Sequence, residues 1–318
     1  MSGPPRVTAI IVNWRTPEET IRSIASLQAA FPMNLRIVVV ENGSRDDSPE
    51  RLAAYVRANA LEPYVSLLVS SENRGFCGGV NLGVARAIAG DSPPDFVWML
   101  NPDAVVSPAT LDELVAVALE SGAQIVSPGR ANTQYRHPKA WPRVFFLTPW
   151  AYNKRFDPAR RWVEAGLYGG SCALFDVELV RKLISVDGHF LGEELFMDWA
   201  EWECTRRAAR WGIRIALARD AAEDHPSEGR VFGSSRIAAT RQYYQSRNAV
   251  VVARRHMPWW QFWPVMPLRL VRDASWFARL RLRGVQPNER AYVLGAVDAF
   301  RGRMGRWKHH PASPPASR

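Results

Sequence analysis

Residues 96–103 read FVWMLNPD, an apolar run that ends abruptly in the polar turn Asn101-Pro102-Asp103. Similar runs occur earlier, where residues 7–12 read VTAIIV and residues 35–40 read LRIVVV. Short apolar runs rich in β-branched residues are typical of strands that are buried on both faces of a parallel sheet. Apolar residues at helical spacing lie between these runs. The alternation predicts an α/β fold with a doubly wound, mainly parallel sheet.

The same patterns continue along the chain and give a set of expected elements. We expect strands over residues 7–12, 35–40, 65–69, 96–100, 169–175 and 213–217, and helices over 16–28, 48–59, 79–88, 196–211 and 236–256. Residues 131–161 are rich in Pro, Arg and aromatic residues without periodicity, which predicts a long ordered loop or lid. Pro258, Pro264 and Pro267 predict that the chain after residue 256 is broken into short pieces.

Polar clusters follow four of the expected strands. They are Asn13, residues 41–46 (ENGSRD), residues 73–81 (NRGFCGGVN) and residues 101–103 (NPD). Each alone is an ordinary turn sequence. Together they would meet at the carboxyl edge of one parallel sheet, where such folds bind ligands. The sequence therefore predicts one polar ligand cleft.

The glycines of residues 75–79 do not form a dinucleotide fingerprint. That fingerprint follows the first strand of its unit and has an acidic residue about 20 positions later. Here the first strand ends at Asn13 without a glycine, and the glycines follow the third strand. This order argues against a nicotinamide enzyme.

The net charge of +10 is concentrated at the C-terminus of the 318-residue chain. From Arg254 onward there are 13 Lys and Arg against 3 Asp and Glu, an excess that equals the net charge of the whole chain. A neutral body with a basic, Trp-bearing extension indicates a partner with an anionic surface. The neutral body and the lack of nucleic-acid-binding motifs argue against nucleic acid. The three cysteines form no Cys-x-x-Cys pair, so neither a disulfide framework nor a zinc cage is expected.

The ordered motifs resemble those of the inverting family 2 glycosyltransferases with the GT-A fold. Asn101-Pro102-Asp103 matches the Asp-x-Asp element of the family, which often has the sequence Asn-Pro-Asp in the rhamnosyl- and galactofuranosyltransferase branch. Residues 41–46 match the pattern Asp-Asn-x-Ser-x-Asp, and residues 73–81 match Asn-x-Gly-Phe-x-x-Gly-x-Asn. The resemblance covers about residues 7–256. It implies transfer of a sugar, such as rhamnose or galactofuranose, in cell-envelope polysaccharide synthesis.

The resemblance also implies a donor site for a dTDP- or UDP-sugar and a divalent cation, Mn²⁺ or Mg²⁺. Asp103 would hold the metal with Asn101 and His225. Glu41 stands where Asp is commonest, which leaves the identity of the base open. The donor contacts that we expect are Asn13, Glu41, Asn42, Ser44, Asn73, Gly75, Asn81 and Asn101.

Inversion needs one carboxylate that takes the proton of the acceptor hydroxyl. Residues 198–203 read DWAEWE, where the family has Glu-Asp-x-Asp or Asp-Asp-x-Asp before Arg and Gly. Counted back from Arg207 and Gly212, Glu201 matches the catalytic base and Glu203 the second acid. Acids are also common at helix N-termini for electrostatic reasons alone. Lower-ranked candidates for the base are Asp198, Glu193 and Glu194.

The acceptor would be a glycan or a lipid-linked sugar, bound in the second half of the chain. The contacts that we expect there are Gly169, Gly170, Trp199 and Arg247. Asn101 and Ala200 each replace a family carboxylate, so the alternative is an inactive domain that only binds nucleotide sugars.

The expected domains are a GT-A unit at residues 1–256, a basic helical extension at 257–310 and a disordered tail at 311–318. The GT-A unit would have a nucleotide half up to about residue 130 and an acceptor half after it. The Trp and Arg residues of 257–283 indicate amphipathic pieces in an anionic membrane interface, or else a cover for the catalytic body. With no signal peptide or spanning segment in the sequence, we expect a cytoplasmic protein on the inner face of the membrane.

Overall fold

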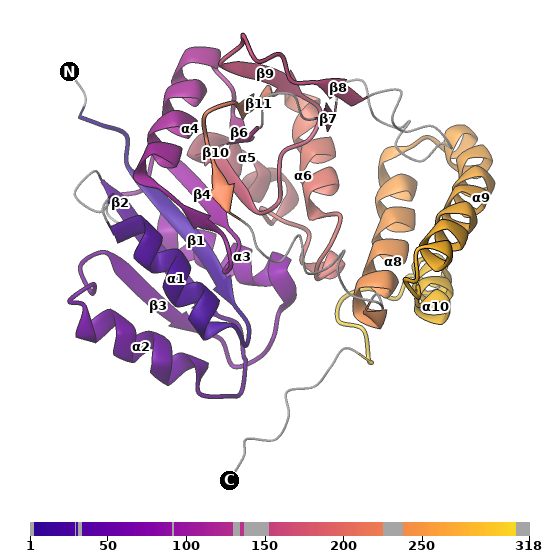
Figure 1. Ribbon diagram of the computed structural model, residues 1–318, viewed down its shortest axis with the longest axis horizontal. Coiled ribbons are helices and arrows are strands. Elements are labelled where there is room, and N and C mark those ends of the chain that lie inside the picture. The colour runs from indigo at the N-terminus through magenta and orange to yellow at the C-terminus, as the bar shows by residue number, and fades with distance from the viewer. Residues whose placement is uncertain are drawn as a thin grey trace.

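The computed structural model describes residues 3–28, 30, 34–90, 92–129, 134–136, 153–224 and 238–309. Its centre is an eight-stranded sheet with the order β3-β2-β1-β4-β10-β6-β11-β9 (Figure 1). These strands are β1 (Val7–Asn13), β2 (Leu35–Glu41), β3 (Val65–Val69), β4 (Phe96–Leu100), β6 (Ile125–Pro128), β9 (Trp162–Ala165), β10 (Cys172–Asp176) and β11 (Ile215–Ala218). The mainly parallel sheet is confirmed, with β10 and β9 antiparallel to their neighbours.

Two small sheets flank the central one. Strand β5 (Val105–Val106) pairs with β12 (Glu223–Asp224), and β7 (Gln134–Arg136) pairs with β8 (Asn153–Arg155). The pairing of β7 with β8 falls inside the loop expected over residues 131–161. The rest of that loop, apart from residues 156–161, lies outside the described residues.

Helices cover both faces of the sheet, as in a doubly wound fold. One face carries α1 (Pro17–Leu27), α2 (Ser48–Ala58) and α4 (Pro108–Ser121), and the other carries α3 (Gly75–Ile88), α5 (Val177–Asp187) and α6 (Ala200–Ala208). Because side chains alternate along a strand, Ala9 and Ile11 join the first core, while Ile10 and Val12 join the second. Both faces of β1 are therefore buried, which explains its continuous apolar sequence.

The strand order places a topological switch beside β1. From β1 the chain moves outward to β2 and β3, and then returns to the other side of β1 as β4. Ile11 pairs with Leu100 in parallel register, so the turns after Asn13 and Leu100 emerge side by side. Ligand sites of open α/β sheets form at such a point.

Helix α3 begins earlier than the sequence predicts. The helix starts at Gly75 and includes the glycines that were expected to form a turn over residues 75–79. A Cβ atom at Gly79 would lie 2.6 Å from Val12 Cγ1, and one at Gly83 would lie 2.5 Å from Ile10 Cγ2. These glycines therefore let α3 pack directly on β1, a tertiary requirement that the sequence alone does not reveal.

The C-terminal part consists of α8 (Ala239–His256), α9 (Trp259–Leu282) and α10 (Glu289–Phe300). Helix α9 is continuous through Pro264 and Pro267, so the prediction of short pieces was wrong. Each proline removes one backbone hydrogen bond, but Val265 and Met266 beside them are buried against the neighbouring helices. Burial of this helix face outweighs the lost hydrogen bonds.

Helix α10 and the residues after it pack on α8. The ring of Trp307 stacks on Tyr243 at a centroid distance of 4.5 Å, and its backbone N–H donates to Tyr244 Oη at 2.8 Å. Tyr243 Oη donates to Asp298 Oδ2 at 2.8 Å. The helices on the two sides of residue 257 therefore form one packed unit. Residues 311–318, expected to be disordered, lie outside the described residues.

Candidate active site

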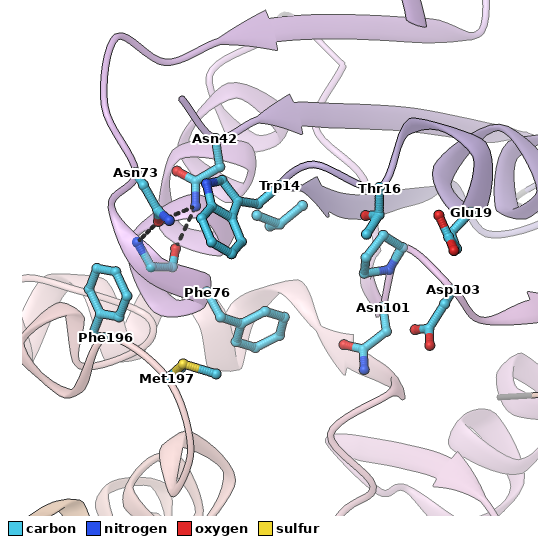
Figure 2. A pocket seen from close by; sticks show the side chains of 13 residues that line it. Trp14, Thr16, Glu19, Asn42, Asn73, Phe76, Asn101, Asp103, Phe196 and Met197 are labelled. Carbon is cyan, nitrogen blue, oxygen red and sulfur yellow. Dashed lines mark hydrogen bonds between the residues drawn. The ribbon is translucent and has the colours of Figure 1, made fainter. Parts of the chain in front are cut away.

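A cleft of about 400 Å³ lies at the carboxyl ends of β1 and β4, a volume within the usual range for small-molecule sites. Figure 2 shows Trp14, Asn42 and Asn73 gathered at one end of it, with Asn101 and Asp103 at the other. The predicted cleft at the strand ends is therefore present. Its lining consists of Val12, Trp14, Thr16, Glu19, Asn42, Asn73, Gly75, Phe76, Asn101, Pro102, Asp103, Phe196 and Met197.

An amide network fixes the first end of the cleft. Asn42 Nδ2 donates to the carbonyl of Gly75 at 2.9 Å and to Asn73 Oδ1 at 3.3 Å. Asn73 Oδ1 also accepts from the backbone N–H of Gly75 at 2.8 Å. Gly75 has φ +73°, and a Cβ atom there would lie 2.3 Å from the carbonyl oxygen of Phe196. The expected contacts Asn42, Asn73 and Gly75 are thus brought together on the cleft wall.

Three other expected donor contacts lie behind this wall. Asn13, Glu41 and Ser44 are buried. Asn13 Oδ1 accepts from Thr20 Oγ1 at 2.9 Å, and Glu41 Oε1 accepts from the backbone N–H of Ser44 at 2.9 Å. Ser44 Oγ accepts from the backbone N–H of Arg15 at 3.0 Å. In this structure these side chains support the turns that form the cleft.

Asn101 and Asp103, the candidate metal ligands, both line the cleft. The third expected ligand, His225, lies outside the described residues. Within the ranges that are described, no three His, Cys, Asp or Glu side chains come close enough to hold a metal ion. One carboxylate with a nearby amide oxygen suits Mg²⁺ or Mn²⁺ when a diphosphate and water supply the other ligands. The residues therefore fit a cation that binds together with a diphosphate.

Glu201, in the first turn of α6, lies directly against Gly170. A Cβ atom at Gly170 would lie 2.1 Å from Glu201 Oε1, so a larger residue would displace the carboxylate. The next residue, Ser171, accepts a hydrogen bond from the backbone N–H of Asn101 at 2.8 Å. Gly170 therefore links the position of Glu201 to the turn that carries Asp103. Desolvation raises the pKa of the Glu201 carboxyl, which favours a role in proton transfer.

The segment that leads into α6 is strained. Phe196, Asp198 and Trp199 have φ values of +68°, +58° and +66°, a region that costs a non-glycine residue roughly 1 kcal/mol or more. Asn248 of α8 holds this segment in place. Its Nδ2 donates to the carbonyls of Leu195 and Asp198 at 2.9 and 3.0 Å. Helix α8 thereby determines where the acidic turn lies.

Arg247, expected at the substrate, is also directed at this segment. It is buried, and its guanidinium donates to the carbonyls of Leu195 at 2.7 Å and Gly305 at 2.5 Å. These bonds join the acidic turn to the segment that follows α10. The geometry gives Arg247 a supporting position beneath the strained segment.

Asp198 presents a buried carboxylate oxygen. Its Oδ2 atom has no hydrogen-bond partner among the described residues. Desolvation raises the pKa of Asp198 to about 7; the positive charge of Arg241 opposes the shift, and the carboxylate of Glu201 adds to it. Asp198 and Glu201 therefore interact, and each makes ionisation of the other harder.

Glu203, the expected second acid, belongs to a buried ion-pair network. Both of its carboxylate oxygens accept from Arg207 Nε at 2.8 Å, and His256 Nε2 lies 3.9 Å from Oε1. Arg207 also pairs with Asp187 at 3.0 Å. Burial opposes the charged form of Glu203, but His256 and Arg207 outweigh it and lower the pKa of this carboxyl. Glu203 thus anchors α6 to α5 and α8.

The lower-ranked acids Glu193 and Glu194 both have basic partners. Glu193 Oε2 lies 3.1 Å from Arg74 Nη2, and Glu194 pairs with Arg255. Asn81 Nδ2 donates to Glu193 Oε1 at 3.1 Å. Asn81, expected near the donor, therefore joins α3 to the short 3₁₀ helix η5 (Glu193–Leu195).

All four expected acceptor contacts, Gly169, Gly170, Trp199 and Arg247, lie outside the cleft lining. The backbone N–H of Gly169 donates to Ser127 Oγ at 3.0 Å. The ring of Trp199 lies 5.8 Å from the guanidinium carbon of Arg269 in α9. Trp199 therefore connects the acidic turn to the C-terminal helices.

Comparison with known proteins identifies the family of this chain. Residues 8–184, more than half of the chain, match the model of glycosyl transferase family 2. The chain belongs to this family. It is 29% identical over 222 residues to galactofuranosyltransferase GlfT1 of Mycobacterium tuberculosis, a match that covers 69% of this chain and 70% of that protein. It is 27% identical over 272 residues to the N-acetylglucosaminyl-diphospho-decaprenol L-rhamnosyltransferase of the same organism, covering 76% and 81%.

Solved glycosyltransferase structures share the fold. A mannosyltransferase from Pyrobaculum calidifontis in complex with GDP-Man and Mn²⁺ superposes with a TM-score of 0.52 at 14% identity, covering 94% of this chain and 89% of that one. Staphylococcus aureus TarS 1–349 in complex with UDP-GlcNAc gives 0.53 at 13% identity, with coverage of 94% and 81%. At this identity the likeness concerns the fold, and it confirms the GT-A architecture of the family 2 enzyme.

The structure adds cleft residues of this glycosyltransferase that the sequence did not single out. Trp14 and Glu19 follow β1, and Phe76 opens α3. Phe196 and Met197 reach the cleft from the strained segment. Trp14 had one local signal, since it directly follows Asn13 at the end of a buried strand. Phe76 belongs to the motif over residues 73–81, whereas Glu19, Phe196 and Met197 depend on how distant segments meet.

Proposed function

We propose that this family 2 glycosyltransferase moves a sugar, with inversion, from a UDP- or dTDP-linked donor to a hydroxyl of a glycan or lipid-linked acceptor. The two mycobacterial relatives are named as galactofuranosyl and L-rhamnosyl transferases, which supports galactofuranose or rhamnose as the sugar. The name of the second relative contains a decaprenol diphosphate. This supports a lipid-linked acceptor and a role in cell-envelope polysaccharide synthesis.

The two ends of the cleft suit the two parts of a nucleotide diphosphate. Trp14 offers an aromatic surface, and Asn42 and Asn73 offer amides beside it, as a nucleoside requires. Asp103 and Asn101 lie at the opposite end, where the diphosphate would extend. A divalent cation held there would neutralise charge on the leaving diphosphate.

The observation that carries the proposal is the position of Glu201 against Gly170, one residue from the Ser171 carbonyl that binds Asn101. A base at this place is outside the cleft lining itself, next to the turn that forms its diphosphate end. Glu201 takes the proton of the acceptor hydroxyl as its oxygen forms a bond to the anomeric carbon. The bond from that carbon to the diphosphate oxygen breaks, and the nucleoside diphosphate leaves with the electron pair.

Two neighbouring acids fit other roles. The carboxylate of Glu203 is fully engaged by Arg207, so we infer that it positions α6. Asp198 interacts electrostatically with both Arg241 and Glu201, and α8 holds its carbonyl through Asn248. The motif register counted back from Arg207 and Gly212 gives Glu201 as the base, so Asp198 ranks below it.

A two-stage experiment tests the function. Thermal melting of the full chain with UDP or dTDP, each with and without Mn²⁺, identifies the nucleotide, because a ligand of the native state raises the melting temperature. The full chain is then incubated with the matching donor, UDP-galactofuranose or dTDP-rhamnose, and with polyprenyl-diphospho-N-acetylglucosamine as the acceptor. Mass spectrometry measures the masses of the products. We expect one added sugar, with inverted anomeric configuration by NMR. Nucleotide binding without transfer to this acceptor or its glycosylated extensions would indicate an inactive binding domain.

A further inference from the structure

Helix α9 exposes a long apolar face to solvent. Trp259, Trp260 and Trp263 are 76%, 58% and 59% exposed, and Leu282 is 88% exposed. Side chains three or four residues apart share one face of a helix. Uncharged positions at this spacing form a stripe along α9 that is exposed throughout, and Arg281, which pairs with Glu289, lies on the same face near its C-terminal end. The stripe consists of Trp260, Trp263, Pro267, Val271, Ala274, Ala278 and Leu282.

The opposite face of α9 is fixed to the protein. Phe262, Val265 and Met266 are buried, and Phe277 packs edge-to-face on Tyr292 of α10 at 5.1 Å. Further along, the buried pair Arg269 and Asp273 is bonded at 3.1 Å. Figure 1 shows α9 at the edge of the molecule, with α8 between it and α6. The apolar stripe therefore cannot turn inward without breaking this packing.

Arginines border the stripe. Arg272, Arg279 and Arg283 follow one another at spacings of seven and four, so they form a row on an adjacent side of α9. Arg272 is paired with Asp273 at 2.6 Å. Residues 254–309 hold 12 Lys and Arg against 3 Asp and Glu. All three acids are already in ion pairs within this part of the chain. The surface around the stripe therefore keeps a strong positive excess.

We propose that α9 lies in the surface of an anionic lipid bilayer, with its stripe among the acyl chains and its arginines at the lipid phosphates. Tryptophans with arginines along one helix are typical of interfacial helices, and cationic side chains are attracted to anionic headgroups. The 24 residues span about 36 Å along the surface. No helix in the described part of the chain is both long enough and apolar enough to cross a membrane.

Charge favours a bilayer over a second copy of the chain as the occupant of this face. Two copies joined through α9 would bring the same positive excess together from both sides, and like charges across an interface cost binding energy. Anionic lipid offers the complementary charge. The inference stands on α9 alone. One consequence does rest on the proposed function: because Arg269 lies 5.8 Å from the Trp199 ring, docking of α9 would hold the start of α6 near lipid-linked acceptors.

Vesicle sedimentation of the full chain tests the proposal. We expect co-sedimentation with vesicles of equal parts phosphatidylglycerol and phosphatidylcholine, much less with phosphatidylcholine alone, and weakening of the anionic binding by salt. Trp260→Ser with Trp263→Ser should lower the partition coefficient by roughly tenfold or more, because the exposed apolar area is lost. Arg279→Ser with Arg283→Ser should lower it by about 25-fold on anionic vesicles, since each arginine contributes about 1 kcal/mol.

The matched control replaces two equally exposed apolar residues far from α9, by Val69→Ser with Leu119→Ser. It should bind vesicles like the wild type. The changed side chains are exposed, so the melting temperatures of the arginine variant and the control should match the wild type without lipid. Trp263 also stacks on Phe300 at 6.2 Å, so the tryptophan variant should melt slightly lower while remaining folded. Three results would overturn the proposal: no binding to anionic vesicles at low salt, unchanged binding of the tryptophan variant, or a lipid-free dimer that the tryptophan variant converts to a monomer.

Discussion

Gly170→Ala should slow sugar transfer by moving Glu201. The added Cβ atom would lie 2.1 Å from Glu201 Oε1 and 2.9 Å from its Cδ. Contacts this short are not tolerated, so the carboxylate must shift by roughly 1 Å, and a misplacement of that size costs about 10²-fold in rate. This corresponds to about 2.7 kcal/mol in the activation barrier. Because the carboxylate is the end of a flexible side chain, the fold should survive.

The assay is a comparison of kcat for transfer, nucleotide affinity and melting temperature. We expect kcat to fall about 10²-fold while nucleotide affinity stays unchanged. Gly169→Ala is the steric comparison, because its new Cβ atom meets nothing closer than 3.9 Å; its effect should be clearly smaller. In a Glu201→Gln background, Gly170→Ala should cost little more, because the two changes act on the same group. Full additivity of the two losses, or a wild-type kcat in Gly170→Ala, would refute the reasoning.

Three further predictions concern the acids. Asp103→Ala should abolish the Mn²⁺-dependent part of the thermal shift caused by UDP or dTDP; an unchanged Mn²⁺ effect would contradict its role as a ligand. Glu201→Gln should lower kcat by roughly 10² to 10⁴ with unchanged nucleotide affinity, and the same loss in Asp198→Asn alone would move the base to Asp198. Folding raises the pKa of Asp198 from 3.8 to about 7. Between these two pH values the folded chain holds a proton that the unfolded chain has lost, so this group lowers the free energy of unfolding as pH rises from about 4 to about 7. The melting temperature of Asp198→Asn relative to that of the wild type should therefore increase as pH rises. A difference between the two melting temperatures that stays constant with pH would contradict the raised pKa.

Much of the fold could be predicted because its signals are local. The runs of residues 7–12, 35–40 and 96–100 become β1, β2 and β4 within about a residue, since a strand buried on both faces needs a continuous apolar sequence. The polar ends of these strands had to meet at one edge of the sheet, which is why the cleft could be placed. The ordered set of motifs at these strand ends was sufficient for the family.

The local sequence did not determine the role of each side chain at the site. Asn42 and Asn73 line the cleft, but Glu41, one residue before Asn42, is buried and bonded to the backbone of Ser44. Neighbouring residues at a strand end point in different directions, and the turn conformation selects which of them faces the ligand. Such turns are held by contacts between segments that are far apart in the chain.

The sequence by itself determined the alternation of strands and helices, the cleft at the strand ends and the basic character of the C-terminal part. Tertiary structure alone decided that α9 runs through Pro264 and Pro267, and that Glu201 lies against Gly170. Periodicity and charge are properties of a short stretch and can be read along the chain. The direction of one carboxylate, or the survival of a helix through proline, depends on the free energy of packing against residues that the local sequence does not contain.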